Sequence, residues 1–338
     1  MRVKITSALG ALAAAAMVAG AIGTAEAGAA GTAEAGAGAA KSSPVRAAHL
    51  PNCGADYFIP CKKAPWYLYL RDGRWVKFPA AARYATEADG TRADEVEDDP
   101  APFEVSGDGG TIAYVRARDG RVVVERWPGG KATVLPAYGK GVGTKYVDLF
   151  LSPDGRRLLV GFAEAAKPRA PMVVDVATGQ TVRTLPATDV PKGLGADGDE
   201  VLATRAKDDN TIEVLAYPLD GEPVADTPPQ EVVSRDSEFV LAADGHTLLV
   251  RPPTAGKQPE RVRAYDLLAR AWAGKGRPIK ATQGTSSLAW GPGGRLELRR
   301  VVGSDEELQR TTRVYALDPA TGVAKQVDKY TIHAGVPK

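Results

Sequence analysis

The chain has 338 residues, of which 44% are hydrophobic, 25% charged and 7% aromatic; this composition is typical of a soluble globular protein and excludes disorder throughout. Lysine and arginine total 43 against 41 for aspartate and glutamate, so the net charge of +2 gives no electrostatic reason to expect nucleic-acid binding. Three histidines and two cysteines are too few for a multi-cysteine zinc module or an iron–sulfur protein.

The first 27 residues have the three-part layout of a secretory signal peptide. Arg2 and Lys4 are basic, residues 8–23 form an apolar run rich in alanine and glycine, and residues 25–27 end in a small-x-small cleavage site. The apolar run is shorter than the roughly 20 residues of a membrane-spanning helix, although an uncleaved anchor remains the alternative. We therefore predict a secreted, extracellular protein, cleaved near Ala27 and not inserted in the membrane afterwards.

The next stretch, residues 28–48, contains mainly alanine, glycine, threonine, glutamate and serine. Such side chains bury too little apolar surface to offset the entropy of ordering, so we predict a disordered spacer. The heptapeptide GTAEAGA occurs at Gly23 and again at Gly31, which leaves a second cleavage site as an alternative for the mature N-terminus.

Residues 49–63 form an N-terminal segment that holds both cysteines, Cys53 and Cys61. In an oxidising compartment we expect two thiols this close in sequence to form a disulfide. The alternative, a metal site with His49, would be incomplete with two cysteines and one histidine.

Residues 64–338 contain a repeated unit of two apolar strands joined by a tight turn. The turn glycines are spaced by 46, 43, 47 and 49 residues, at Gly109, Gly155, Gly198, Gly245 and Gly294. Asp-Gly and Gly-Gly between alternating apolar runs are strong hairpin signals. A second hairpin follows in every unit, so each repeat predicts four antiparallel strands, the blade of an all-β propeller. A two-sheet sandwich is the alternative, but it does not require equal spacing.

The mean step of about 46 residues predicts six blades for residues 64–338, with five and seven as alternatives. The hairpin that starts at Trp66 lacks a preceding hairpin of its own. We therefore expect the C-terminal residues 329–338 to add a strand to it, so that the two ends of the chain close the sixth blade together.

The segments FLSPDGRRLLVGF at residues 150–162 and MVVDVATGQTVRTLP from Met172 resemble the repeats of TolB-like and WD40-like bacterial propellers. The resemblance extends over residues 64–328. The complete Ser-Pro-Asp-Gly signature occurs only at residues 152–155, and the sequence contains no Gly-His pair followed by the Trp-Asp pair of WD40 repeats. The resemblance implies a secreted or periplasmic propeller that binds something, and it leaves the ligand open.

In a four-stranded blade both hairpin turns lie on one rim of the disc, which we call the turn rim, and the other loops lie on the opposite, loop rim. The loop rim carries the long loops, at residues 80–101, 162–171, 205–210, 251–261 and 299–312. We predict that cations in these loops hold an anionic glycan or a peptide carboxylate. They are Lys167, Arg169, Lys207, Arg251, Lys257, Arg261, Arg299 and Arg300. The alternative is that they are ordinary solvated surface charges.

The sequence contains no Gly-x-Ser-x-Gly motif, and its histidines do not stand in a recognisable catalytic order. We predict no catalytic residue, metal or cofactor, and a monomeric, non-enzymatic propeller that binds a protein, peptide or cell-envelope glycan through the loop rim. The alternative is a lyase or hydrolase acting on a glycan or lactone in the central channel. Converging carboxylates or a perturbed histidine at the channel mouth would favour this enzyme.

Overall fold

The computed structural model describes most of the chain from Ser43 onwards. The described residues are 43–53, 60–61, 63–93, 100–135, 143–162, 169–207, 210–234, 237–253, 259–279, 285–302, 309–333 and 335–337. The predicted signal peptide, Lys167 and Lys257 lie outside them. Within the described part, no helix is long and apolar enough to span a membrane.

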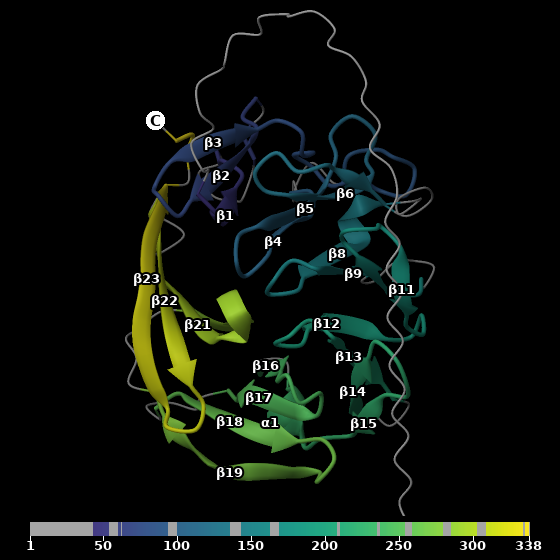
Figure 1. Ribbon diagram of the computed structural model, residues 1–338, viewed down its shortest axis with the longest axis vertical. Coiled ribbons are helices and arrows are strands. Elements are labelled where there is room, and N and C mark those ends of the chain that lie inside the picture. Colours follow the sequence, from purple (N-terminus) through teal and green to yellow (C-terminus); the bar gives the residue numbers. More distant parts are fainter. Residues whose placement is uncertain are drawn as a thin grey trace, which may run out of the picture. The chain divides into compact units, whose positions relative to one another are not determined.

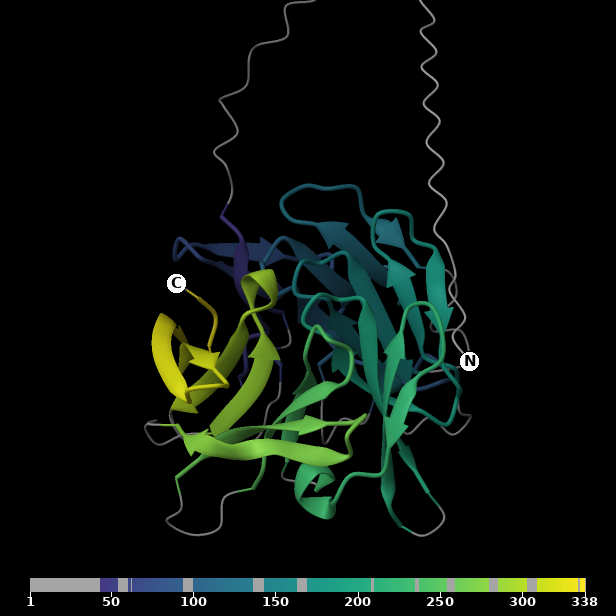
Figure 2. The same cartoon turned by 60° about the horizontal axis from the view of Figure 1, so that its bottom comes forward.

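Six antiparallel sheets follow one another around an axis, which confirms the predicted six-bladed propeller (Figures 1 and 2). Blade 1 contains β1 (Val45–His49), β2 (Trp66–Leu70) and β3 (Trp75–Phe78); blade 2 contains β4 (Phe103–Val105), β5 (Thr111–Val115), β6 (Val122–Arg126) and β7 (Thr133–Val134). Blade 3 contains β8 (Val147–Leu151), β9 (Arg157–Phe162), β10 (Met172–Asp175) and β11 (Thr181–Thr184); blade 4 contains β12 (Val190–Leu194), β13 (Glu200–Ala206), β14 (Ile212–Pro218) and β15 (Val224–Asp226). Blade 5 contains β16 (Glu238–Leu241), β17 (Thr247–Arg251), β18 (Arg261–Asp266) and β19 (Ala271–Pro278); blade 6 contains β20 (Thr285–Trp290), β21 (Leu296–Val302), β22 (Gln309–Asp318) and β23 (Val323–His333). Three short helices, η1 (Thr144–Tyr146), α1 (Gln230–Val233) and η2 (Pro292–Gly294), lie between strands.

The hydrophobic core lies between the blades. Both faces of the middle strands are buried, so β5 and β9 are almost continuously apolar rather than alternating. Between blades 2 and 3, for example, Val124 packs in one cluster with Leu158 and Val174. Full burial of each such side chain contributes about 1.5 to 3 kcal/mol, which makes these interfaces the main source of stability.

The turns between the first two strands of the blades connect neighbouring blades on the turn rim. In the β8–β9 turn, Ser152 Oγ donates to Asp154 at 2.8 Å, and Asp154 accepts the backbone N–H of Arg156 at 3.0 Å. Gly155 in this turn has a φ of +67°, and its carbonyl accepts a 3.3 Å hydrogen bond from Thr111 Oγ1 at the start of β5. The turn of one blade therefore rests on the second strand of the blade before it.

Blade 1 differs from the predicted arrangement at both ends of the chain. Strand β23 completes the sheet of blade 6, so the expected blade shared by the two termini was wrong. Instead β1 supplies blade 1 from residues 45–49, and most of this strand falls inside the predicted spacer. The spacer boundary is corrected because Val45 is only 1% exposed and packs with Leu68 and Ile112.

The contacts of β1 identify its place in the blade. Val45 N donates to Gly109 O at 2.9 Å, and the guanidinium of Arg71, which follows β2, donates to Gly107 O at 3.1 Å. Both acceptors lie in the β4–β5 turn, so β1 begins at the turn rim, as β5 does. It therefore corresponds to a second strand, and no described strand takes the innermost place of this three-stranded blade.

Polar and aromatic side chains join blades 6 and 1, at the contact we call the closing interface. Arg46 Nε lies 3.0 Å from Asp328 Oδ2, and the Arg46 guanidinium lies 5.3 Å from the ring centroid of Tyr69 and 5.6 Å from that of Tyr330. An apolar cluster spans each of the other five interfaces, whereas none of the clusters of described residues spans this one. Arg46 therefore links blade 1 to Asp328 and Tyr330 of blade 6.

Cys53 and Cys61 form the predicted disulfide, with their Cα atoms 4.9 Å apart. This bond is compatible with an extracellular or periplasmic location. Replacing both cysteines by serine is expected to lower the free energy of unfolding by about 2 to 3 kcal/mol, because the open chain gains conformational entropy in the unfolded state. Urea unfolding checks this. The variant and the wild-type protein with its disulfide reduced should have the same midpoint, below that of the oxidised wild-type protein. An unchanged midpoint in both would contradict the expected stabilisation.

Candidate binding site on the loop rim

The structure brings two of the predicted binding cations together, Arg251 and Arg300, between blades 5 and 6. Arg251 lies 3.1 Å from Glu238 and 3.5 Å from Glu260, and Arg300 also pairs with Glu260. The side chain of Arg300 is only 5% exposed, and its burial, together with the nearby charge of Arg251, lowers the pKa of Arg300. Two glutamates thus compensate two arginines, and the cluster joins adjacent blades.

The other described members of the predicted set are dispersed over blades 3 to 6. Arg299 lies 3.3 Å from Glu297, and Arg261 donates to Gly276 O at 3.3 Å. Arg169 precedes β10 and Lys207 follows β13. Ligand binding by these residues stays a prediction.

One carboxylate on an innermost strand has an unusual environment. Removal from water raises the pKa of Glu104, on β4, to about 7, and the positive charge of Arg299 opposes this increase. The charged form of Glu104 is therefore unfavourable in the folded protein around neutral pH.

Glu104→Gln is expected to remove this pH-dependent cost. Because the folded-state pKa lies above the ordinary value of 4.5, folding loses stability as the pH rises from about 4.5 to 7 and regains none above that. The substitution should raise the free energy of unfolding by about 3 kcal/mol near pH 8 and change it little near pH 4. Unfolding at both pH values checks this, with the exposed Glu222→Gln as control. An equal effect at the two pH values would contradict it.

The long insertion at residues 80–101 is anchored to the first two blades on the loop rim. Trp66 Nε1 donates to Ala82 O at 2.7 Å, and Ala82 N donates to Val115 O at 2.7 Å. Further along, Glu87 N donates to Thr91 O at 2.8 Å across a small hairpin. These hydrogen bonds therefore anchor the described part of this loop, as a binding surface requires.

The insertion and the β5–β6 loop enclose a cavity of about 880 Å³, which we call the arginine cleft. It is lined by residues 82–90, Arg92, residues 115–121 and Thr144. Five arginines line it against three acids: Arg83, Arg92, Arg116, Arg118 and Arg121 against Glu87, Asp89 and Asp119. The lining therefore carries a positive excess of two charges.

The arginines of the cleft differ in their contacts and in their exposure to solvent. The Arg92 guanidinium lies 3.5 Å from the ring centroid of Tyr84. Arg116 Nε donates to Asp119 at 2.9 Å, and this hydrogen bond lowers the pKa of Asp119. Arg118 is 74% exposed, with its Nε 4.0 Å from Asp119, and Arg121 is also exposed. Arg118 and Arg121 therefore present their charge to solvent.

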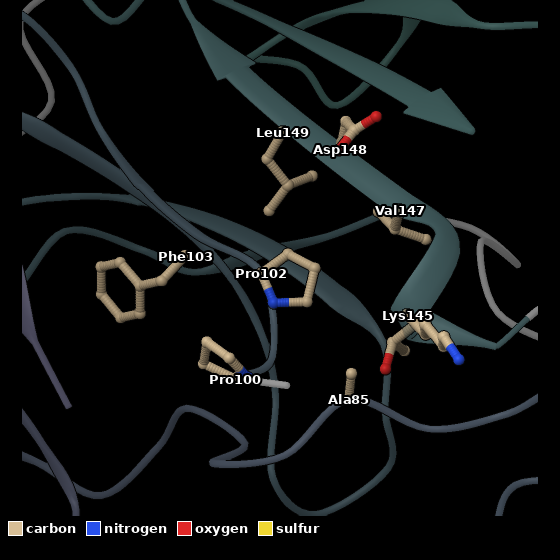
Figure 3. Close-up of a pocket in the computed structure, with 9 residues that line it drawn as sticks. Ala85, Pro100, Pro102, Phe103, Lys145, Val147, Asp148 and Leu149 are labelled. Atoms are coloured by element: carbon tan, nitrogen blue, oxygen red, sulfur yellow. The ribbon is translucent and has the colours of Figure 1, made fainter. Parts of the chain in front are cut away.

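A second cavity, of about 360 Å³, adjoins the arginine cleft and is called the proline pocket here. Its walls come from Pro100 and Pro102, before β4, and from Val147 and Leu149 on β8 (Figure 3). The Lys145 ammonium points away from these groups (Figure 3) and lies 3.2 Å from Glu87 Oε1. The proline pocket thus combines buried apolar side chains with the polar groups of Thr144, Lys145 and Asp148.

One carboxylate, Asp148, belongs to the lining of the proline pocket. Burial raises its pKa, and the positive charge of Lys192 opposes the increase. A second negative charge placed in this pocket would meet both desolvation and repulsion from Asp148.

Sequence reasoning singled out the loop rim and the insertion, where this candidate site lies, but it did not name the arginines of the cleft. The insertion stood out as the longest loop, and the run RARDGR at residues 116–121 joins the second and third strands of blade 2. The sequence feature that could have indicated the cleft is this run, which has three arginines in six residues between two strands. Among the described residues, no group of three histidine, cysteine or acidic side chains could hold a metal ion.

Comparison with known proteins finds solved structures with a similar fold. No family model matches the chain, and no curated protein matches it. TolB from Acinetobacter baumannii is similar in structure, with 14% identity and a TM-score of 0.45, over 80% of this chain and 60% of that one. The Cps50 (Swd1) β-propeller domain from Myceliophteria thermophila has 17% identity and a TM-score of 0.41, over 68% of this chain and 71% of that one. Structures similar to this fold therefore include both TolB and WD40 propellers, and the chain spans less than two thirds of the Acinetobacter protein.

Proposed function

We propose that this chain is an exported, monomeric, non-enzymatic propeller that binds a protein, peptide or cell-envelope glycan through its loop rim. The observation that carries the proposal is the arginine cleft, a cavity of about 880 Å³ built on the longest loop of that rim. Cavities of this size with a few convergent polar groups are typical ligand sites. A propeller scaffold that presents loops for binding is consistent with this function.

Export is supported by two independent features of the chain. The signal-peptide layout of residues 1–27 would direct the chain out of the cytoplasm. The disulfide between Cys53 and Cys61 is suited to an oxidising compartment.

The electrostatics of the arginine cleft favour an anionic group on the ligand. Exposed guanidinium groups can bind carboxylate, sulfate or phosphate oxygens through two parallel hydrogen bonds. Because Arg118 and Arg121 face solvent, salt screens their contribution to affinity. We expect them to affect the association rate more than the affinity.

The double variant Arg118→Glu, Arg121→Glu is expected to weaken ligand binding at least about tenfold, because repulsion replaces attraction. The measurement is binding of the mature protein to arrays of acidic peptides and of uronic or sulfated glycans. The double variant Lys131→Glu, Lys325→Glu makes the same change in net charge at two exposed lysines outside the cleft, and it should bind like the unmodified protein.

A third variant tests the cations predicted from sequence. It has shortened loops within residues 252–260 and 303–308, between β17 and β18 and between β21 and β22, and it therefore lacks Lys257. Unchanged binding by this variant, with loss in the cleft variant, supports the arginine cleft as the site. Equal binding by the cleft variant and the unmodified protein would reject it.

A further inference from the structure

We propose that the disulfide-bonded N-terminal segment positions one wall of the arginine cleft through Tyr84, and that a dithiol that opens the disulfide between Cys53 and Cys61 weakens anion binding in the cleft. This inference rests on the proposed function and adds a form of regulation to the same site. The disulfide then has a second role besides stabilising the fold.

The disulfide-bonded segment is docked on blade 1 by side-chain and backbone contacts. Cys61 is only 5% exposed and packs in one cluster with Tyr67 on β2. Cys61 N donates to Pro51 O at 2.7 Å. Asn52 and Pro60 form an antiparallel bridge beside this hydrogen bond. The disulfide therefore locks together two paired stretches of backbone that rest on the second strand of blade 1.

Tyr84 connects this segment to the arginine cleft. Its Oη donates to Pro60 O at 3.2 Å, and Pro60 is the buried residue that precedes Cys61. The ring of Tyr84 faces two arginines of the cleft lining. The Arg92 guanidinium lies 3.5 Å from the ring centroid and that of Arg83 lies 5.4 Å from it. One side chain thus contacts the carbonyl beside the disulfide and two cations of the cleft.

The backbone on both sides of Tyr84 carries the rest of the wall. Arg83 O accepts a 3.1 Å hydrogen bond from Ala101 N, and Ala85 O accepts one of 3.1 Å from Ala93 N. These two bonds join the stretch around Tyr84 to later parts of the insertion. A displacement of Tyr84 is therefore expected to loosen the backbone that lines the cleft as well as the two arginines.

Thiol–disulfide exchange at this bond is directed by the different exposure of the two cysteines. Cys53 is exposed and Cys61 is buried, so an incoming thiolate attacks the sulfur of Cys53 and Cys61 leaves as a thiolate, which takes up a proton. The second thiol of the reductant then attacks the mixed disulfide. The dithiol is oxidised to a cyclic disulfide by loss of two electrons, and both cysteines become thiols. Pro60 O is then no longer held in place for the Tyr84 hydroxyl.

The test is hydrogen exchange followed by mass spectrometry of the complete mature protein, oxidised and after treatment with dithiothreitol. Exchange in residues 82–93 should be at least about fivefold faster after reduction, because the segment that holds Tyr84 is released. Strands β13 and β14, on the other side of the propeller, should keep their protection. The variant Tyr84→Phe removes only the hydroxyl and should accelerate exchange in residues 82–93 about fivefold in the oxidised protein.

A combination of the two changes tests whether they act through the same contact. Tyr84→Phe should add no further acceleration once the disulfide is reduced, because the hydroxyl has then already lost its fixed acceptor. The matched control is Tyr265→Phe, which removes another hydroxyl hydrogen bond, of 2.7 Å to Asp226. It should leave exchange in residues 82–93 unchanged. Equal exchange in the oxidised and reduced proteins, or full additivity of reduction and Tyr84→Phe, would overturn the proposed coupling.

Binding is measured with fluorescein-labelled polyglutamate as the anionic probe. We expect reduction and Tyr84→Phe each to lower its affinity about threefold to fivefold. The melting temperature of Tyr84→Phe should stay close to that of the unmodified protein, which separates this effect from a loss of folding. Faster exchange in residues 82–93 with unchanged affinity would overturn the regulation of binding.

The outcomes separate this inference from the proposed function. Absence of polyglutamate binding, or binding that Arg118→Glu, Arg121→Glu does not reduce, overturns the anionic site and with it the regulation of binding. The exchange measurements need no ligand, so they still decide whether the disulfide holds the wall of the cleft through Tyr84.

Discussion

Gly109→Ala is expected to destabilise the propeller by about 3 kcal/mol or more. Gly109 has a φ of +75°, and a Cβ atom at this position would lie 2.1 Å from the carbonyl oxygen of Val45. The obstructing atom is backbone, so a side-chain rotation cannot relieve the contact. Relief requires the β4–β5 turn to move away from β1, which breaks the hydrogen bond from Val45 N to Gly109 O.

The matched control for this substitution is Gly293→Ala. Gly293 also has a positive φ, of +68°, but a Cβ atom there has no neighbour within 4 Å. Alanine should cost about 1 kcal/mol at Gly293, from the backbone conformation alone. Chemical denaturation of both variants measures the difference, and equal losses would show that the contact with Val45 is not a constraint on the fold.

Arg46→Ala should destabilise the protein by about 2 to 4 kcal/mol and should weaken one interface selectively. The substitution removes the ion pair with Asp328 and two cation–aromatic contacts, with Tyr69 and Tyr330. It also leaves the carboxylate of Asp328, whose side chain is 22% exposed, without this arginine. Blade 1 then loses the contacts of Arg46 with Asp328 and Tyr330 of blade 6.

Hydrogen exchange followed by mass spectrometry measures this selectivity. Strands β1–β3 and β22–β23 should exchange faster in the variant, while β8–β10 should keep their protection. Arg74→Ala is the control, because Arg74 also pairs with an aspartate, Asp72, but is 56% exposed, and it should change neither stability nor exchange. Uniform loss of protection over all six blades would contradict a specific role of the closing interface.

The architecture could be predicted because it depends on local pattern. The turns at Gly109, Gly155 and Gly198 recur at nearly constant spacing, and a hairpin forms from residues that are neighbours in sequence. Blade 1 could not be predicted in the same way. Strand β1 contains Ala47 and Ala48 after a long run of small residues, and Val45 is fixed by a turn far along the chain, at Gly109.

The candidate site shows the same division between local and long-range information. The positions of the loop rim and of the insertion followed from the order of strands. Whether an acidic side chain compensates an arginine depends on residues that are distant in sequence. Arg300 is compensated by Glu260, 40 residues away, whereas Arg118 remains exposed on its own loop. A list of cations in loops cannot separate these two situations without the spatial arrangement.

Each described sheet is built from a single uninterrupted portion of the chain, including those at both termini. Gain or loss of a terminal blade by duplication or deletion in the gene would therefore leave every remaining sheet whole. The residues that meet across the closing interface, such as Arg46 and Asp328, would have to be matched again. This arrangement gives a simple evolutionary route between propellers of different blade number.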